Sequence, residues 1–176
     1  MKFNIDILSE GEAINFYKNY NEESKCLLIS ITEEHEDVTF GYKENVIVFR
    51  THFSDIEKEV PTRKLTLMKF SQALELKCII DEAIKLGIVN IIVHCKAGIS
   101  RSGAVGCVLA RYLNKSDLYL WKYGNIHPNK WVYRLMCEAF NLEYSEKDFK
   151  YKQRISKKVL DKRFSDYGIS VGDMFK

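Results

Sequence analysis

The chain contains three short apolar runs, and each has the length of one buried strand. They cover residues 26–31, 46–49 and 89–94. Their near-continuous and largely β-branched character is typical of strands in a parallel sheet that is covered on both faces. A fourth segment, residues 3–8, is interpreted as an edge strand.

Apolar residues between and after these runs recur at helical spacing. Within residues 71–86 they fall every three or four positions, and Gly87 follows as a natural C-terminal stop. A helix there makes a right-handed crossover between two parallel strands. Further helices are predicted over residues 11–20, 102–113 and 128–140, whereas residues 114–125 are predicted to be irregular. The pattern therefore predicts an α/β fold with a central, mostly parallel sheet of about four to five strands flanked by helices.

The composition is that of an ordinary globular protein, with 176 residues, 46% of them hydrophobic, and a net charge of +3. This charge is too small to argue for a nucleic-acid partner. No apolar run approaches the roughly 20 residues that span a bilayer, and residues 1–6 do not resemble a signal peptide. The five cysteines are odd in number and irregularly spaced, which favours reduced thiols over a disulfide framework. We therefore expect a cytoplasmic, monomeric protein.

Charge is concentrated near the C-terminus. Between Lys147 and Arg163 there are eight basic residues and two acidic ones. Such a run is typical of a solvated helix or a mobile arm. We interpret residues 143–176 as a basic C-terminal arm attached to a single domain that spans residues 1–176.

The chemistry is carried by the stretch from His94 to Ser102, which reads His-Cys-Lys-Ala-Gly-Ile-Ser-Arg-Ser. A predicted strand ends at Cys95, a tight turn follows, and a helix begins near Arg101. Backbone N–H groups in such a turn can converge on one centre, and the helix N-terminus adds partial positive charge. Gly98 permits the turn, and the Arg101 guanidinium can bind two phosphoryl oxygens. The predicted phosphate-binding residues are Lys96, Ala97, Gly98, Ile99, Ser100 and Arg101.

The same positive field favours the thiolate of Cys95, which is the reactive form of cysteine. Ser102 can donate a hydrogen bond to this sulfur when it leaves. His94 is expected to orient the loop through hydrogen bonds rather than to act as a base.

These residues resemble the His-Cys-x5-Arg-Ser/Thr signature of the cysteine-dependent protein-tyrosine phosphatase superfamily. The sequence Ala-Gly-Ile-Ser-Arg-Ser within this stretch is most similar to the dual-specificity branch of that superfamily. The resemblance extends more weakly over residues 26–141. It implies a single phosphatase domain that hydrolyses phosphotyrosine in proteins, with phosphoserine and phosphothreonine as further substrates. The expected partner is thus a phosphorylated protein or peptide, with no nucleic acid and no membrane span.

The resemblance also implies a two-step mechanism. Cys95 attacks the phosphorus and forms a cysteinyl-phosphate, while an aspartic acid protonates the leaving oxygen and then activates water. Neither a metal nor a cofactor is implied, because backbone amides and Arg101 stabilise the phosphoryl oxygens.

The general acid should lie upstream of Cys95 on a loop. Of the two aspartates between residues 50 and 95, Asp81 falls within a predicted helix and is interpreted as surface charge. Asp55 follows the second apolar run and is the predicted acid. It lies 40 residues before Cys95, which is more than the family's usual spacing, and extra loop between residues 55 and 71 can absorb the excess. Glu57 and Glu59 are the fallback candidates.

Asn129 begins the last predicted helix, with Pro128 beside it, and is interpreted first as a helix N-cap. The resemblance adds a second interpretation, in which a polar side chain from this later loop faces the pocket.

Two alternative functions remain open. The first is the same chemistry on a phosphoinositide or an RNA 5′-phosphate; Lys96 and the basic tail favour it, whereas Ile99 stands where a lipid-type loop tends to carry a second lysine. The second is a module that binds phosphate with little turnover, which would require Asp55 to lie outside the pocket.

Overall fold

A computed structural model describes residues 2–36 and 38–165 of the chain. The four described strands lie before residue 96, together with the first two helices, and the described elements that follow them are all helices. In chain order the elements are β1 (Asn4–Ser9), α1 (Glu10–Asn19), β2 (Cys26–Thr32), β3 (Val46–His52), α2 (Phe70–Lys85), β4 (Asn90–Cys95), α3 (Arg101–Asn114), α4 (Leu118–Tyr123), α5 (Lys130–Ala139) and α6 (Glu146–Ser165).

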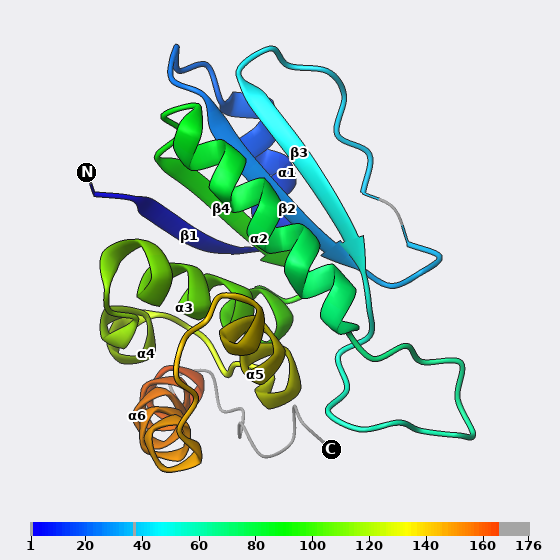
Figure 1. Ribbon diagram of the computed structural model, residues 1–176, viewed down its shortest axis with the longest axis vertical. Coiled ribbons are helices and arrows are strands. Elements are labelled where there is room, and N and C mark those ends of the chain that lie inside the picture. Colours follow the sequence, from blue (N-terminus) through cyan, green and yellow to red (C-terminus); the bar gives the residue numbers. More distant parts are fainter. Residues whose placement is uncertain (1, 37, 166–176) are drawn as a thin grey trace.

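The described strands form one four-stranded, all-parallel sheet in the order β1-β4-β2-β3 (Figure 1). This confirms the predicted α/β class, the four predicted strands and the edge position of the first one. Because all four strands run the same way, their carboxyl ends meet at one edge of the sheet. Ser9, Thr32, His52 and Cys95 end the strands there, and in such sheets this edge is where ligands bind.

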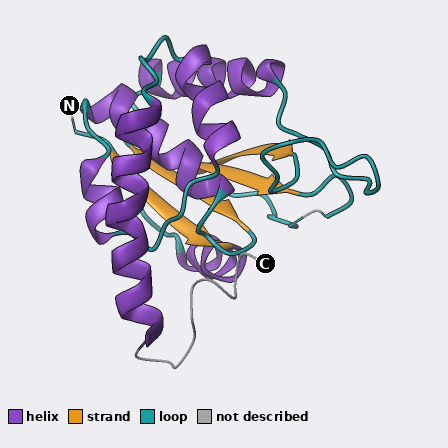
Figure 2. Cartoon of the chain, turned by 90° about the horizontal axis from the view of Figure 1, so that it is seen from below, coloured by secondary structure: helices purple, strands orange, loops and turns teal. Residues whose placement is uncertain are grey.

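Helices cover both faces of the sheet (Figure 2). The larger core contains Leu27 and Ile29 of β2 together with buried side chains of α2, α3 and α5. On the opposite face Leu28 packs with Ala13 and Tyr17 of α1. This two-sided burial explains why β2 reads as a continuous apolar run, since alternate residues enter different cores.

The segment predicted to be irregular, residues 114–125, contains the short helix α4. Leu120 and Trp121 anchor it in the core, and the Trp121 indole Nε1 donates to Asp117 at 2.8 Å. Six residues are too few to show a helical period in the sequence, so the prediction was wrong here because tertiary burial forms the helix.

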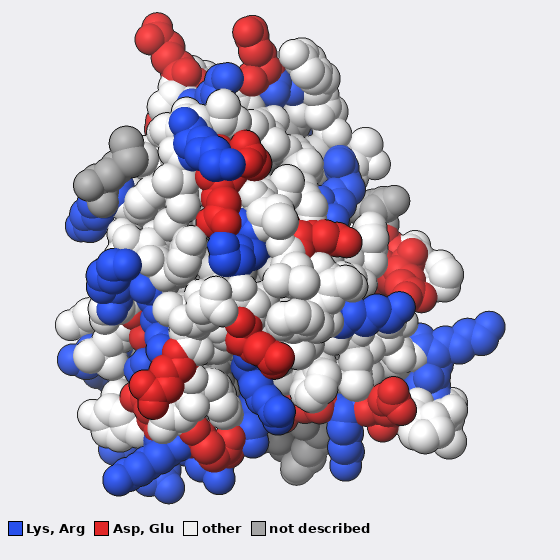
Figure 3. Space-filling model, viewed as in Figure 1, with Lys and Arg blue, Asp and Glu red and all other residues white. Residues whose placement is uncertain are grey.

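The basic stretch near the C-terminus forms helix α6 over its described part. One side of α6 is buried through Phe149, Ser156 and Leu160, and Lys152 reaches Asp117 at 2.9 Å. Figure 3 shows Lys and Arg side chains, with acidic ones between them, at the lower left, where Figure 1 places α6. Residues 166–176 of the expected arm lie outside the described residues. In the part of the chain that the structure describes, no helix combines the length and apolar character needed to cross a bilayer.

Candidate active site

The loop between β4 and α3 has its carbonyl groups turned outward. The Lys96 carbonyl accepts from the Glu10 N–H at 3.2 Å, and the carbonyl of Ile99 accepts from the His127 N–H at 2.9 Å. The carbonyl of Ser100 accepts from the Asn129 N–H at 3.2 Å. In a planar trans peptide the next residue's N–H points opposite to the carbonyl. The amides that follow these three carbonyls therefore point toward the interior of the loop, as an anion cradle requires.

Glycine is required at position 98 for two independent reasons. Its φ is +72°, in the left-handed region that disfavours side chains. In addition, a Cβ there would lie 2.5 Å from the backbone nitrogen of Ser9 and 2.6 Å from the carbonyl carbon of Leu8. The end of β1 thus supports the loop from outside, and this close approach fixes the loop's shape.

The sulfur of Cys95 lies at the start of α3, 3.1 Å from the hydroxyl oxygen of Ser102. Both residues are buried. The sulfur therefore sits beside the positive end of a 14-residue helix and within reach of a hydroxyl donor. This is the relation between the two side chains that the sequence predicts.

Arg101 is almost completely buried, with 5% of its surface exposed. Its Nη1 donates to the Glu33 carboxylate at 3.0 Å and to the Phe53 carbonyl at 2.8 Å. Its Nε is buried and has no hydrogen-bond partner among the described residues. An unsatisfied donor on a buried cation is costly. The guanidinium is therefore anchored at one nitrogen and retains a donor that an anion can satisfy.

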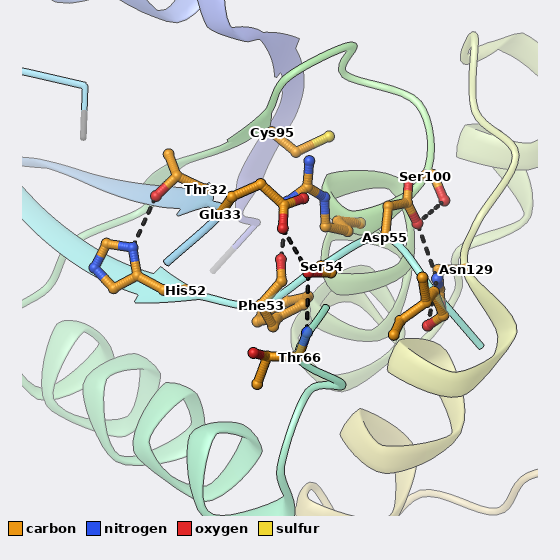
Figure 4. A network of polar contacts seen from close by, with 12 residues as sticks. Thr32, Glu33, His52, Phe53, Ser54, Asp55, Thr66, Cys95, Ser100 and Asn129 are labelled. Atoms are coloured by element: carbon orange, nitrogen blue, oxygen red, sulfur yellow. Dashed lines mark hydrogen bonds and ion pairs between the residues drawn. The ribbon is translucent and has the colours of Figure 1, made fainter. Parts of the chain in front are cut away.

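Glu33 is a site residue that the sequence reasoning missed. It follows the carboxyl end of β2, and its second carboxylate oxygen accepts from the Ser54 hydroxyl at 2.5 Å. The Ser54 hydroxyl in turn accepts from the Thr66 N–H at 3.1 Å. Figure 4 shows this chain of contacts from Glu33 through Ser54 to Thr66, below Cys95. The signal that could have revealed Glu33 is its position directly after a predicted parallel strand.

The structure brings Asp55 to the rim of the loop. Its Oδ1 accepts from the Ser100 hydroxyl at 2.7 Å and from the Asn129 side-chain amide at 2.9 Å. In Figure 4 its carboxylate points toward these two side chains. The unusual spacing from Cys95 is absorbed by the long connection between β3 and α2, which runs from residue 53 to residue 69.

The other acidic candidates have different partners. Asp81 on α2 accepts from Lys77 at 2.5 Å and from Tyr112 at 3.0 Å, as expected for surface charge. Glu57 accepts from the Lys130 N–H at 2.9 Å, at the start of α5. Glu59 lines a separate hollow between the long β3–α2 connection and α5.

Asn129 is the N-cap of α5, as the sequence predicts, and its side chain also reaches Asp55. Its side-chain oxygen accepts from the Val132 N–H at 3.0 Å, which is the N-cap bond of α5. Its side-chain nitrogen donates to Asp55 and, at 3.2 Å, to the carbonyl of Ile56. The residue therefore connects the segment carrying Asp55 to the start of a helix.

His94 lies at the carboxyl end of β4, directly before Cys95. Its ring is fully buried and packs edge-on against Phe40, with the ring centroids 5.6 Å apart. Neither ring nitrogen has a well-formed hydrogen bond among the described residues. Burial lowers the pKa of His94, and a contact with the Cys95 backbone opposes this in part. That His94 orients the loop through hydrogen bonds stays a prediction.

The remaining loop residues lie around the cradle. Lys96 is exposed and its ammonium pairs with Glu10 at 3.0 Å, so this side chain is directed to the loop's outer edge. Ala97 is exposed, and Ile99 is half-buried. Among the described residues, no group of three or more His, Cys, Asp or Glu side chains could hold a metal ion.

Neither the family models nor the curated proteins give a match to this chain. Solved structures do. Human DUSP28 is 15% identical with a TM-score of 0.44, and the match covers 90% of this chain and 94% of that one. OH1 from the Orf virus, described as a tyrosine phosphatase with triple substrate specificity, is 14% identical with a TM-score of 0.43, over 85% and 80%.

A third neighbour is the human tyrosine phosphatase-like serine/threonine/tyrosine-interacting protein, which is 15% identical with a TM-score of 0.42, over 86% of this chain and 85% of that one.

Proposed function

We propose that this protein is a cysteine-dependent phosphatase that hydrolyses phosphotyrosine in proteins, with phosphoserine and phosphothreonine as further substrates. One observation carries the proposal. The sulfur of Cys95, the inward amides of its loop and the unsatisfied Nε of Arg101 occur together at the N-terminus of α3. A tetrahedral dianion is the ligand that such a set of donors suits, and a thiolate beside it is a nucleophile.

In the first step the Cys95 thiolate attacks phosphorus, and the bond between phosphorus and the ester oxygen breaks. The leaving oxygen takes a proton from Asp55, so that a neutral alcohol or phenol departs. The inward amides and Arg101 hold the phosphoryl oxygens throughout, and fixed donors of this kind need little reorganisation as charge moves. The product on the enzyme is a cysteinyl-phosphate.

In the second step water attacks phosphorus and the sulfur–phosphorus bond breaks. Asp55, now a carboxylate, takes a proton from the water. The departing thiolate receives a hydrogen bond from the Ser102 hydroxyl, which lies 3.1 Å away. Inorganic phosphate leaves, and the enzyme returns to its starting state, since the proton from the attacking water has left Asp55 protonated and the sulfur departs as a thiolate.

The position of Asp55 favours turnover over simple phosphate binding. A binding module would require this carboxylate to lie away from the loop, whereas it accepts a hydrogen bond from Ser100 of the loop itself. Both donors contact Oδ1, so these hydrogen bonds leave Oδ2 available to carry the transferable proton.

The experiment compares the wild type with Cys95→Ser and, as a matched control, Cys78→Ser, which alters an exposed cysteine on α2. With p-nitrophenyl phosphate, Cys95→Ser should lose turnover and still bind tungstate, while Cys78→Ser should behave like the wild type. Rapid quenching and peptide mass spectrometry should find the phosphoryl group on Cys95. Turnover by Cys95→Ser at the wild-type rate would overturn the proposal.

The substrate class is tested with the wild-type protein on a matched panel. It comprises phosphotyrosine, phosphoserine and phosphothreonine peptides of one sequence, a phosphoinositide in vesicles and an RNA with a 5′-phosphate. We expect the highest kcat/KM on the phosphotyrosine peptide. A higher kcat/KM on the lipid or the RNA would leave the proposed mechanism in place and would overturn the proposed substrate class.

A further inference from the structure

The outer edge of β1 is unpaired along part of its length. Among the described strands β1 pairs with β4 alone, and the Asn4 N–H donates to the Val89 carbonyl at 2.9 Å on that side. Alternate residues therefore direct their backbone groups to the other side. At Phe3 these groups are satisfied by the side-chain amide of Asn114, which donates to its carbonyl at 2.9 Å and accepts from its N–H at 3.1 Å.

Beyond Phe3 the pairing on this side stops. Ile5 and Ile7 follow in the same alternation, and no described strand or side chain bonds their outward N–H and carbonyl groups. Unpaired backbone groups of an edge strand are a template for another strand. The contact between Asn114 and Phe3 shows that outward backbone groups of this edge can hydrogen-bond to an amide group.

A groove runs along this edge and has room for a strand. It consists of two adjoining hollows of about 1000 and 510 Å³ that share Ile5, Asp6 and Tyr119 as lining residues. The first extends to Asn114 and the second to Gly98. We call the two hollows together the β1-edge groove.

The two walls of the β1-edge groove differ in chemistry. Asp6 is in register with Ile92, which packs with α1, so Asp6 faces the α1 side. Glu22, just after α1, lines the same hollow. The opposite wall carries Tyr119 and Tyr123 of α4, which are 41% and 81% exposed. The α1 side of the groove thus carries two acids together with the rings of Phe16 and Tyr20, and the α4 side carries two exposed tyrosines. Lys2 and Lys115 also line the first hollow, whereas the second has no basic residue in its lining among the described residues.

We propose that the β1-edge groove binds an extended peptide segment of a partner protein as an added strand beside β1. Side chains of a strand alternate between its two faces. A strand in this groove would therefore place every second side chain toward Asp6 and Glu22 and the others toward Tyr119 and Tyr123. The matching segment alternates basic and apolar residues, with main-chain hydrogen bonds to Ile5 and Ile7 giving affinity and side chains giving selectivity. The proposal does not rest on the proposed function, because it requires no chemistry at Cys95, although the groove also reaches Ala97, Gly98 and Ile99 on the outer side of the loop.

The test uses a fluorescein-labelled peptide of alternating valine and lysine, with flanking serines for solubility. A second peptide carries N-methyl groups on the amides of one edge, which removes its donors without changing its charge. Binding is measured by fluorescence anisotropy for the wild type, for Asp6→Lys and for the control Glu75→Lys, which reverses an exposed acid on α2. Circular dichroism confirms that each variant is folded.

We expect N-methylation and Asp6→Lys each to weaken binding about tenfold or more. Either the loss of two hydrogen bonds or the reversal of one charge pair is enough for about a tenfold change in affinity. Glu75→Lys should leave affinity within about twofold of the wild type. Amide NMR shifts on titration should centre on Ile5 and Ile7. Equal binding of the methylated peptide, no effect of Asp6→Lys, or no binding at all would overturn the proposal.

Two other occupants are distinguished in the same series. Sedimentation of the wild type and Asp6→Lys tests for a second copy. If the wild type is a dimer and Asp6→Lys is a monomer, the groove would be assigned to a second copy of the chain instead of a partner peptide. A chain that ends at residue 165 tests for the protein's own C-terminal residues. If the probe bound this shortened chain and not the full one, the groove would be assigned to the chain itself.

Discussion

Glu33 provides the sharpest test of how the active site is built. Its two carboxylate oxygens have separate tasks, since Oε1 accepts from Arg101 and Oε2 accepts from Ser54. Glu33→Gln keeps the size of the side chain and leaves it one acceptor oxygen. The glutamine oxygen is expected to face Arg101, which can only donate, while the glutamine NH₂ donates to the Ser54 hydroxyl, which can also accept. The contact with Arg101 then loses its charge and holds the guanidinium less firmly, which makes Glu33 a positioning residue.

The size of the effect follows from burial. A hydrogen bond to a charged group contributes roughly 1.5–3 kcal/mol. The Arg101 side chain is 6% exposed and that of Glu33 is 33% exposed, so solvent screens the pair in part. The Phe53 carbonyl still holds Nη1 after the substitution. We therefore expect a loss of about 1–2 kcal/mol in transition-state stabilisation, or about 5–30-fold in kcat/KM.

The assay measures kcat and KM on p-nitrophenyl phosphate, together with the inhibition constant of tungstate. A displaced guanidinium should weaken tungstate binding and lower kcat/KM in parallel, whereas a purely structural role would lower the fraction of folded enzyme and leave the inhibition constant unchanged. Glu34→Gln is the matched control, because Glu34 is the exposed neighbour and makes no hydrogen bond or ion pair with the site among the described residues. Wild-type kinetics and inhibition in Glu33→Gln, or an equal loss in Glu34→Gln, would refute the reasoning.

Three further predictions follow from the site. Gly98→Ala should lower the free energy of unfolding by about 2–4 kcal/mol, because it combines a left-handed backbone with a clash at Ser9; urea unfolding measures this, and a change below about 0.5 kcal/mol would contradict it. Asp55→Asn should slow hydrolysis of phenyl phosphate far more than that of p-nitrophenyl phosphate, whose leaving group needs no proton; equal losses would mean that Asp55 is not the acid. Burial lowers the pKa of His94 below its unfolded value near 6.5. The unfolded state therefore binds more protons between the two pKa values, so stability from this group is complete above about pH 6.5 and falls as pH decreases toward the folded pKa. In His94→Asn, urea unfolding between pH 7.5 and 5.5 should show a smaller loss, and an unchanged pH dependence would rule out this role.

The strands and the loop could be predicted because their signals are local. The continuous apolar run of β2 reflects burial on two faces, and the turn at Gly98 reflects one residue's backbone freedom. Helix α4 escaped prediction because its anchor, the contact between Trp121 and Asp117, gives no periodic pattern. The contact of His94 with Phe40 was missed for a similar reason, since Phe40 lies in a loop far along the chain.

The contacts of the site that could not be predicted from the sequence are those that depend on the order of the strands in the sheet. Glu33 follows β2 and lies 68 residues from Arg101 in the chain. The two meet because β2 is the neighbour of β4 in the sheet, and all the strands point the same way. Asp55 was predicted because the mechanism that the sequence resemblance implies calls for an acid upstream. Nothing in the sequence calls for a second carboxylate that contacts the arginine, so only the sheet order reveals it.

The way Arg101 is held gives a physical reason for enclosing a cation inside a protein. A buried guanidinium with no partner would be costly, and one with every nitrogen paired would have nothing to offer a ligand. Here Glu33 and the Phe53 carbonyl occupy Nη1, while Nε is left without a partner among the described residues. The cost of burial is thus offset only in part before the substrate arrives. Under the proposed function, a phosphoryl group would supply the missing acceptor without having to order a long side chain, and this preorganisation would favour both binding and the transition state.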